Sequence, residues 1–373
     1  MKIESIKEKL HNAIIQAERS TSKKTSLPIL NNIILEVKNK KLFIKSTNLE
    51  IGLELEVSAK VEGDYITALN PMVLNNLLSN LFNEDKIEIE DIDNNLHIKT
   101  KNGSISIKTT KPDDFPIIPK INPTNLLKIN KQEFINSLKS VIYASALSDI
   151  KPEISSVYIY TKDDNLVFVA TDSFRLSEKK IKNNNLPLKE DLNIILPLKN
   201  GLEISRILSD YNNEDEDIEL IVDNNQIAII SNGLYITSRI IDGVYPDYNQ
   251  IMPKNFKTSV EVDRQDFINT LKLAGVFSDK FNRLKLIVEK DNLIIETKNT
   301  ETGEGLFKIK INNQSGDNID LVVNSRYLLE VFQSFDDNKV FLGLNKEGDR
   351  SKPLYIKGES DNTFQALVMP ISI

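Results

Sequence analysis

The sequence predicts an α+β protein of three similar domains, each with two half-repeats in which a helix precedes antiparallel strands. One strand-like segment recurs six times at intervals of roughly 60 residues. A helix with apolar residues three and four positions apart precedes each copy. Two of these helices, after Asn130 and after Asp263, are near-copies of each other. The strand copies begin at Leu42, Leu96, Leu166, Ile227, Leu293 and Leu354.

The six helices are predicted from apolar spacing and from start signals. The first has an apolar face of Ile6, Leu10, Ile14 and Ala17. The second starts with Asn-Pro, an amide cap followed by a proline whose missing N–H is harmless in the first turn. Its apolar positions are Leu74, Leu77, Leu78 and Leu81. In order, the helices are expected at about Ile3–Arg19, from Asn70-Pro71, after Asn130, at about Lys199–Tyr211, after Asp263 and at about Arg326–Phe335.

The strands alternate apolar and polar residues, which is typical of antiparallel sheet with one solvated face. Leu96–Asn102 is the clearest case, because Leu96 and Ile98 alternate with His97 and Lys99. Four of the six copies follow Asn-Asn, Asp-Asn or a near variant. These residues tolerate the positive φ of a tight hairpin turn.

Two proline-rich strings mark the predicted domain boundaries. They are Asp114-Phe-Pro-Ile-Ile-Pro119 and Tyr245-Pro-Asp-Tyr-Asn-Gln-Ile-Met-Pro253. The predicted domains are therefore about 1–125, 126–253 and 254–373.

Composition excludes several classes of protein. The chain of 373 residues has 40% hydrophobic and 27% charged residues, as in ordinary soluble proteins. It has no cysteine, hence no disulfide or thiolate site, and no apolar run of membrane-spanning length or signal-peptide core, so we expect a cytoplasmic protein. The net charge of −7 argues against a surface that grips nucleic acid all over, although a local basic face is compatible with it.

Residues for catalysis are sparse, and the sequence predicts neither an enzyme nor a metal or cofactor site. His11 and His97 have no partner at ligand spacing. Ser173 beside Asp172 lacks a histidine base and a nucleophile-elbow context. The acidic run Asn212–Asp217 lacks the spaced ligands and the glycine of a calcium loop.

Four strings together resemble the bacterial DNA polymerase III β subunits, the sliding clamps. They are Leu27-Pro-Ile-Leu30, Ala170-Thr-Asp-Ser-Phe-Arg-Leu176, Asp242-Gly-Val-Tyr-Pro-Asp-Tyr248 and Val368-Met-Pro370. They stand in the family's order, and the likeness covers the whole chain. The resemblance implies the DNA clamp fold, with two copies joined head to tail in a ring around duplex DNA that tethers the polymerase and gives processivity.

The resemblance also implies three sets of site residues. A partner-peptide pocket would comprise Ile154, Thr171, Ser173, Phe174, Arg175, Leu176, Pro246, Gln250, Ile251, Asn324, Tyr327, Pro353, Leu367, Val368, Met369, Pro370 and Ile371. The candidates for contact with DNA are basic residues expected near the hole, of which Lys24 and Lys199 match basic positions of the family; they are Lys23, Lys24, Lys151, Lys199, Arg206, Lys272, Lys280 and Arg283. Ile105 and Ile107 of one copy would meet Val276 and Phe277 of the other.

Residue types in the pocket suit an apolar slot, walled by residues such as Leu176 and Met369, with Arg175 and Asn324 binding peptide carbonyls. Phe174 replaces the family's usual histidine, and Ser372-Ile373 replaces its common Arg-Leu ending. The family often has a basic residue near Met72, and this chain does not.

The implied partners are double-stranded DNA bound without sequence preference, the polymerase III α subunit, the clamp loader, repair polymerases and a second copy, with no membrane. Two alternatives remain open at this point. One is a repeat scaffold that binds peptides without DNA, and the other is a carboxylate-dependent hydrolase. Light scattering separates a ring from a monomeric enzyme, and a clamp-loading assay separates a clamp from a scaffold.

Overall fold

The computed structural model describes residues 1–22, 27–93, 95–100, 103–121, 125–182, 191–211, 216–348 and 350–371. Contacts divide them into two compact units. Unit 1 holds the described residues of 1–135 and 199–240, and unit 2 holds those of 136–198 and from 241 onward. The two predicted domain boundaries, and the three domains that they separate, stay predictions.

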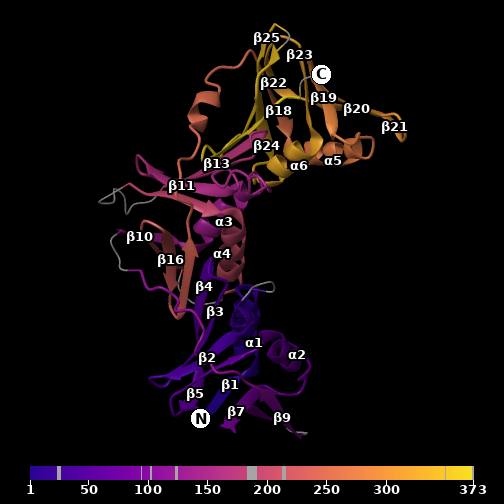
Figure 1. The fold of residues 1–373 in the computed structure, drawn as a ribbon. Coiled ribbons are helices and arrows are strands. Elements are labelled where there is room, and N and C mark those ends of the chain that lie inside the picture. The colour runs from indigo at the N-terminus through magenta and orange to yellow at the C-terminus, as the bar shows by residue number, and fades with distance from the viewer. Residues whose placement is uncertain are drawn as a thin grey trace. The chain divides into compact units, whose positions relative to one another are not determined.

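Unit 1 contains an eight-stranded and a five-stranded sheet (Figure 1). The larger has the order β10-β15-β16-β17-β4-β3-β2-β6 and the smaller the order β5-β1-β7-β8-β9. The strands of the larger are β2 (Ile33–Lys38), β3 (Lys41–Thr47), β4 (Ile51–Val57), β6 (Tyr65–Leu69), β10 (Asn125–Asn130), β15 (Asp217–Val222), β16 (Gln226–Ser231) and β17 (Leu234–Arg239). Those of the smaller are β1 (Lys2–Ile6), β5 (Ala59–Glu62), β7 (Lys86–Ile92), β8 (Asn95–Thr100) and β9 (Gly103–Lys108).

Unit 2 contains a nine-stranded sheet, a four-stranded sheet and a two-stranded ribbon. The nine-stranded order is β14-β11-β12-β13-β28-β27-β24-β18-β22, and the four-stranded order is β21-β20-β19-β23. The nine strands are β11 (Ser156–Lys162), β12 (Asn165–Thr171), β13 (Arg175–Lys182), β14 (Asn193–Pro197), β18 (Thr258–Asp263), β22 (Asn312–Gly316), β24 (Lys339–Leu344), β27 (Leu354–Gly358) and β28 (Phe364–Val368). The others are β19 (Arg283–Glu289), β20 (Asn292–Asn299), β21 (Gly303–Lys310), β23 (Ile319–Asn324), and the ribbon strands β25 (Lys346–Glu347) and β26 (Arg350–Ser351).

All six predicted helices are present. They are α1 (Lys7–Arg19), α2 (Pro71–Ser79), α3 (Lys131–Ile142), α4 (Leu198–Asp210), α5 (Arg264–Gly275) and α6 (Ser325–Gln333), and two 3₁₀ turns cover Pro28–Asn31 and Tyr248–Ile251. The predicted cap of α2 acts as expected, and α5 has a cap that was not predicted. Asn70 accepts a hydrogen bond from the Met72 N–H, and Asp263 accepts one from the Asp266 N–H. Each cap satisfies one of the N–H groups that a helix start leaves without a partner.

The prediction that the first helix starts at about Ile3 is wrong, because a strand precedes the helix. Residues Lys2–Ile6 form strand β1, and α1 begins only at Lys7. In the strand, Ile3 and Ser5 are buried while Ile6 is 46% exposed, so Ile6 does not belong to the apolar face of the helix. Strand pairing of β1 with β5 and β7 overrides the local helical spacing.

All six strand copies are strands, and they are β3, β8, β12, β16, β20 and β27. Hairpin turns with positive φ precede several of them, as the turn residues predict. Asp93 and Asp163 have φ of 52° before β8 and β12, and Lys290 has φ of 46° before β20. Among the described helices, none has the length and apolar character that crossing a membrane requires.

Candidate functional site

The turn between β12 and β13 contributes several residues to the predicted peptide pocket in unit 2. The Thr171 hydroxyl donates to the Arg175 carbonyl oxygen over 2.6 Å and accepts from the Ser173 N–H over 3.1 Å. The Asp172 carboxylate accepts from the N–H groups of Phe174 and Arg175, both at 2.9 Å. These bonds hold Ser173 at a φ of 75° and leave Phe174 61% exposed at the tip. The string Thr-Asp-Ser-Phe-Arg therefore encodes a fixed turn.

Arg175 is an internal connector, and the prediction that it binds peptide carbonyls stays a prediction. It is only 9% exposed. Its Nε donates to Asp172 Oδ2 over 3.0 Å, its Nη2 donates to the Tyr143 carbonyl oxygen over 2.6 Å, and its Nη1 donates to Glu330 on α6. The guanidinium also lies over the Tyr327 ring, 4.4 Å from its centroid. Arg175 thus ties β13 to α6 and to the residue after α3.

Asn324 also has a structural task. Its side-chain oxygen accepts hydrogen bonds from the N–H groups of Arg326 and Tyr327, which caps α6. Its side-chain nitrogen donates to the Phe281 carbonyl oxygen over 3.4 Å. Capping explains its place at the start of α6, and only its side-chain nitrogen can donate to a peptide carbonyl, which stays a prediction.

Backbone pairing brings the two ends of the pocket set together. β13 pairs with β28, with Arg175 opposite Val368 and Leu176 opposite Leu367. Just beyond β28, the Met369 N–H donates to the Phe174 carbonyl oxygen over 2.7 Å. Residues about 190 apart in sequence therefore meet in one sheet.

Exposure separates the pocket set into two groups. Leu176, Leu367 and Val368 are at most 1% exposed and belong to the core of unit 2. The residues that present surface are Ile154, Ser173, Phe174, Pro246, Gln250, Ile251, Tyr327, Pro353, Met369, Pro370 and Ile371. Residues of this exposed group can contact a peptide directly, while the buried group packs beneath them in the core.

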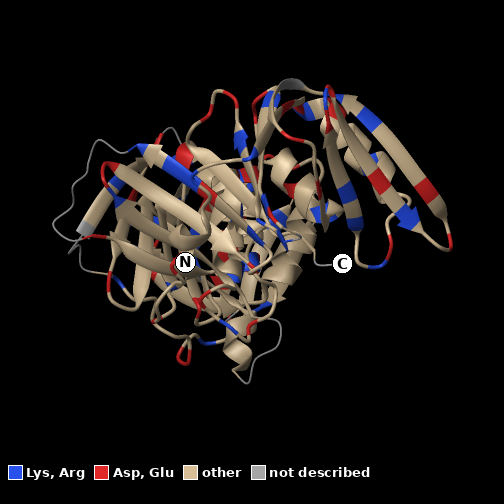
Figure 2. Cartoon of the chain, turned by 90° about the horizontal axis from the view of Figure 1, so that it is seen from above, with Lys and Arg blue, Asp and Glu red and all other residues tan. Residues whose placement is uncertain are grey.

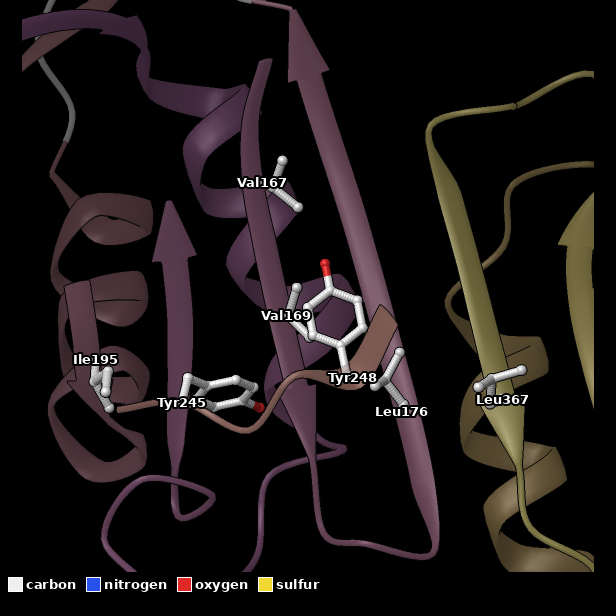
Figure 3. Packing of buried hydrophobic residues seen from close by; sticks show 7 residues of the cluster. All are labelled: Val167, Val169, Leu176, Ile195, Tyr245, Tyr248 and Leu367. Carbon is white, nitrogen blue, oxygen red and sulfur yellow. The ribbon is translucent and has the colours of Figure 1, made fainter. Parts of the chain in front are cut away.

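The segment after Ile241 crosses the nine-stranded sheet and packs on it through tyrosines (Figure 3). Tyr245 and Tyr248 form a buried cluster with residues of β12, β13, β14 and β28. Tyr245 stacks on Tyr158 with ring centroids 4.7 Å apart. The cluster comprises Val167, Val169, Leu176, Ile195, Tyr245, Tyr248 and Leu367. The predicted boundary string is thus anchored beside the candidate site.

A buried carboxylate, Glu178, was not singled out in the sequence. It is 3% exposed on β13 and accepts hydrogen bonds from the Tyr248 hydroxyl and from Gln365 on β28. Burial, followed by the charge of Glu178, raises the pKa of Tyr248 well above its usual range. Tyr160 meets the Tyr248 hydroxyl at 2.7 Å. An isolated Glu in a strand gives no local signal of such a network.

The residues predicted for the dimer contact lie at two sheet edges. β9 ends the five-stranded sheet of unit 1, and β21 ends the four-stranded sheet of unit 2. Val276, just after α5, is 65% exposed. Phe277 lies over the start of β21, where a Cβ added to Gly305 would come 3.2 Å from its ring. Ile107 is 6% exposed and Ile105 is half-buried, so β9 presents mainly its backbone edge, and the contact of these two residues with Val276 and Phe277 of a second copy stays a prediction.

The described residues of the predicted DNA set are all exposed, while Lys23 and Lys24 lie outside the described residues. Two of them have acidic neighbours, since Arg206 pairs with Glu203 at 2.6 Å and Arg283 with Asp279 at 2.5 Å. Figure 2 shows Lys and Arg interspersed with Asp and Glu along the strands. The remaining exposed members are Lys151, Lys199, Lys272 and Lys280.

Within the described ranges, no group of three His, Asp or Glu side chains could hold a metal ion. His11 meets the Asn75 side-chain oxygen at 2.8 Å, and His97 meets Ser106 at 3.4 Å. Most of the acidic run that begins at Asn212, and the terminal Ser372-Ile373, lie outside the described residues.

Comparison with known proteins gives consistent matches along the whole chain. Three family models match in succession, the N-terminal, central and C-terminal domains of the DNA polymerase III beta subunit, at residues 1–119, 128–247 and 249–372. The chain is 25% identical to a beta sliding clamp of Synechococcus elongatus, with 100% of both chains covered. It is 27% identical to one of Rickettsia bellii, with 96% of each covered.

Solved structures of the same kind superpose closely. The beta subunit from DNA polymerase of Streptococcus pyogenes aligns with a TM-score of 0.93 at 20% identity, covering 100% of both chains. The beta subunit of DNA polymerase III from Thermotoga maritima aligns with a TM-score of 0.91 at 22% identity, covering 100% of this chain and 99% of that one. These structures confirm the predicted clamp fold.

Proposed function

The chain belongs to the DNA polymerase III β-subunit family, the bacterial sliding clamps, and on this premise we propose that two copies close head to tail around duplex DNA. The observation that carries the function is the succession of three clamp-domain matches over 1–119, 128–247 and 249–372. It favours a DNA sliding clamp over a peptide scaffold without DNA and over a hydrolase. We keep 1–125, 126–253 and 254–373 as the proposed domains, and we place the protein in the cytoplasm.

Ring closure is proposed to use the two free sheet edges. An edge strand presents unpaired N–H and C=O groups that can pair with a strand of another chain. β9 and β21 are such edges, each at the end of its sheet. With one edge on unit 1 and the other on unit 2, the contact is heterologous, and two copies of it close a twofold ring. Val276 and Phe277 would add apolar contact beside β21.

Retention on DNA is proposed to come from encirclement rather than from grip. A protein that holds DNA by phosphate contacts loses affinity steeply with salt. This chain has a net charge of −7, and the described basic candidates Arg206 and Arg283 already have acidic partners. Charge therefore supplies modest steering, and a closed ring supplies retention without reading sequence.

Partner binding is proposed at the surface around Phe174, Ile251 and Met369 in unit 2. An exposed aromatic tip, an exposed isoleucine and a flexible methionine suit the apolar anchor of a short linear peptide. The polymerase, the clamp loader and repair polymerases are the proposed sources of such peptides. The buried Leu176 and Val368 hold this surface in place.

The experiment that tests encirclement compares one loaded complex before and after its DNA is cut. The protein is loaded by a cognate ATP-dependent loader onto nicked circular DNA and separated by gel filtration in moderate salt. We expect retention on the circle, loss after linearisation, and recovery when both ends are blocked. Cutting changes no local contact, so equal retention on open linear and circular DNA would refute the ring.

A further inference from the structure

Unit 1 contains a second turn built like the one that opens the peptide surface. The Thr47 hydroxyl donates to the Ile51 carbonyl oxygen over 2.8 Å and accepts from the Leu49 N–H over 3.0 Å. The Asn48 side-chain oxygen accepts from the Ile51 N–H over 2.8 Å. Leu49 has a φ of 76°.

Each of these features has a counterpart 124 positions later, in the turn that begins at Thr171. Thr171, Asp172 and Ser173 make the same bonds at 2.6, 2.9 and 3.1 Å, and Ser173 has a φ of 75°. Leucine gains nothing from positive φ, a region that L-residues rarely adopt. The shared turn therefore reflects the repeat and not local preference.

The strands that meet at the two turns also correspond. In unit 1, β4 pairs with β17 so that Gly52 lies opposite Thr237, just as Leu176 lies opposite Leu367 in unit 2. The Arg239 N–H donates to the Glu50 carbonyl oxygen over 2.9 Å, which matches the bond from Met369 to Phe174 at 2.7 Å. Arg239 thus occupies the position of Met369.

A pocket of about 460 Å³ opens at this place in unit 1. Its lining includes Leu49, Glu50, Ile117, Gln226, Arg239 and Ile240. Gln226 matches Pro353 in the repeat, because Ile227 faces Ser238 as Leu354 faces Val368. Leu49 is 44% exposed and Ile117 is 92% exposed, so apolar side chains are presented to solvent.

Charge defines what this pocket would take. Arg239 is exposed and forms no ion pair with any residue that the structure describes. A guanidinium binds a carboxylate through charge-assisted and often bidentate hydrogen bonds. Along an extended backbone, the Gln226 amide can donate or accept, and the Glu50 carboxylate can accept from N–H groups.

We propose that this pocket of unit 1 is a second peptide-binding site, which takes a short extended segment of a partner protein carrying one apolar side chain and one carboxylate. The carboxylate pairs with Arg239, and the apolar side chain packs among Leu49, Ile117 and Ile240. The inference rests on the proposed peptide surface of unit 2, whose repeat partner this pocket is. Because Arg239 stands where unit 2 has Met369, the two sites select different peptides.

The test uses the full-length protein with ¹³C-labelled isoleucine methyl groups. The probe is a panel of N-acetylated hexapeptides, each with one Leu or Phe and one Asp, observed by methyl NMR. Ile117 and Ile240 report the unit 1 pocket, while Ile251 and Ile371 report the unit 2 surface. We expect saturable shifts at Ile117 and Ile240. Arg239→Ser, and Asp replaced by Asn in the peptide, should each weaken this binding at least tenfold.

Matched variants separate the two sites. Arg19→Ser removes another exposed arginine of unit 1, outside the pocket, and should leave the shifts at Ile117 and Ile240 unchanged, and Met369→Ala should reduce only the shifts at Ile251 and Ile371. Shifts confined to Ile251 and Ile371, or unchanged affinity in Arg239→Ser, overturn the second site. The panel with Asn in place of Asp also probes the unit 2 surface, and absence of shifts at Ile251 and Ile371 with both panels overturns that surface instead, so the two failures are distinguishable.

Discussion

Replacing Arg175 with methionine separates a structural role for this residue from a direct role in peptide binding. Methionine keeps much of the length of the side chain and removes the charge and every hydrogen bond. It leaves Asp172 and Glu330, whose side chains are 12% and 26% exposed, without their shared cation. The change should therefore loosen β13, β28 and α6 rather than remove a peptide contact.

The magnitude follows from burial. Removing one partner of a buried ion pair costs about 3–5 kcal/mol, and the partial exposure of Glu330 and its second contact with Arg326 place this case nearer 2–3 kcal/mol. Loss of the contact with the Tyr327 ring at 4.4 Å adds about 0.5–1 kcal/mol. A total near 3 kcal/mol corresponds to an increase of roughly a hundredfold in the equilibrium constant for local opening.

Native-state hydrogen exchange by mass spectrometry measures this locally. Amides of β13 and β28 should lose about a hundredfold in protection, while β2 and β3 in unit 1 stay unchanged as an internal control. Adding Glu330→Gln should recover part of the loss, because the stranded carboxylate is removed. The reasoning is refuted if protection changes less than about threefold while peptide affinity falls, since Arg175 would then act on the peptide directly.

Three further predictions follow from single contacts. Val276→Asp should place a charge in the apolar part of the ring contact and give monomers by light scattering, whereas Lys272→Asp should stay dimeric; a dimeric Val276→Asp at low micromolar concentration would show that the contact lies elsewhere. Leu49→Gly should be about 1 kcal/mol more stable than Leu49→Ala in urea unfolding, because only glycine accepts a φ of 76° without strain, and equal midpoints would contradict this. Burial raises the pKa of Tyr143 from 10.0 to about 12, because the buried phenol resists losing its proton. The contribution of the protonated Tyr143 to the free energy of unfolding is therefore complete below pH 10 and is lost between pH 10 and 12. Tyr143→Phe should therefore flatten the alkaline fall of the urea midpoint in that range, and an unaltered pH dependence would exclude the assignment.

Local signals predicted the repeating elements well. The cap Asn70 and the turn before Leu166 are encoded within a few residues, so the sequence alone places them. The prediction of where α1 starts was wrong because Ile3 fits the spacing of a helix and of a strand equally. Only the pairing of β1 with β5 and β7 decides between them. Local patterns are reliable where the element is settled locally.

The candidate site could be predicted only in part. Resemblance supplied Phe174 and Met369, and the structure brings them together through one backbone hydrogen bond. The tasks of Arg175 and Asn324 could not be predicted, because Glu330 lies 155 residues from Arg175 and capping competes for Asn324. The pocket beside Arg239 was not predicted either, because which residues line it depends on the register between β4 and β17.

The free edges of β9 and β21 also concern the protein before it assembles. In the proposed ring a second copy covers both edges, so a newly synthesised copy would expose them until it meets another, and unpaired edges are templates for aggregation. β21 places Glu304, Lys308 and Lys310 along its length, and β9 ends in Lys108, so charge discourages pairing with unrelated strands. A heterologous contact that fails to close instead propagates as a filament. In the proposed ring, fast association of two copies would therefore also limit aggregation of the unassembled protein.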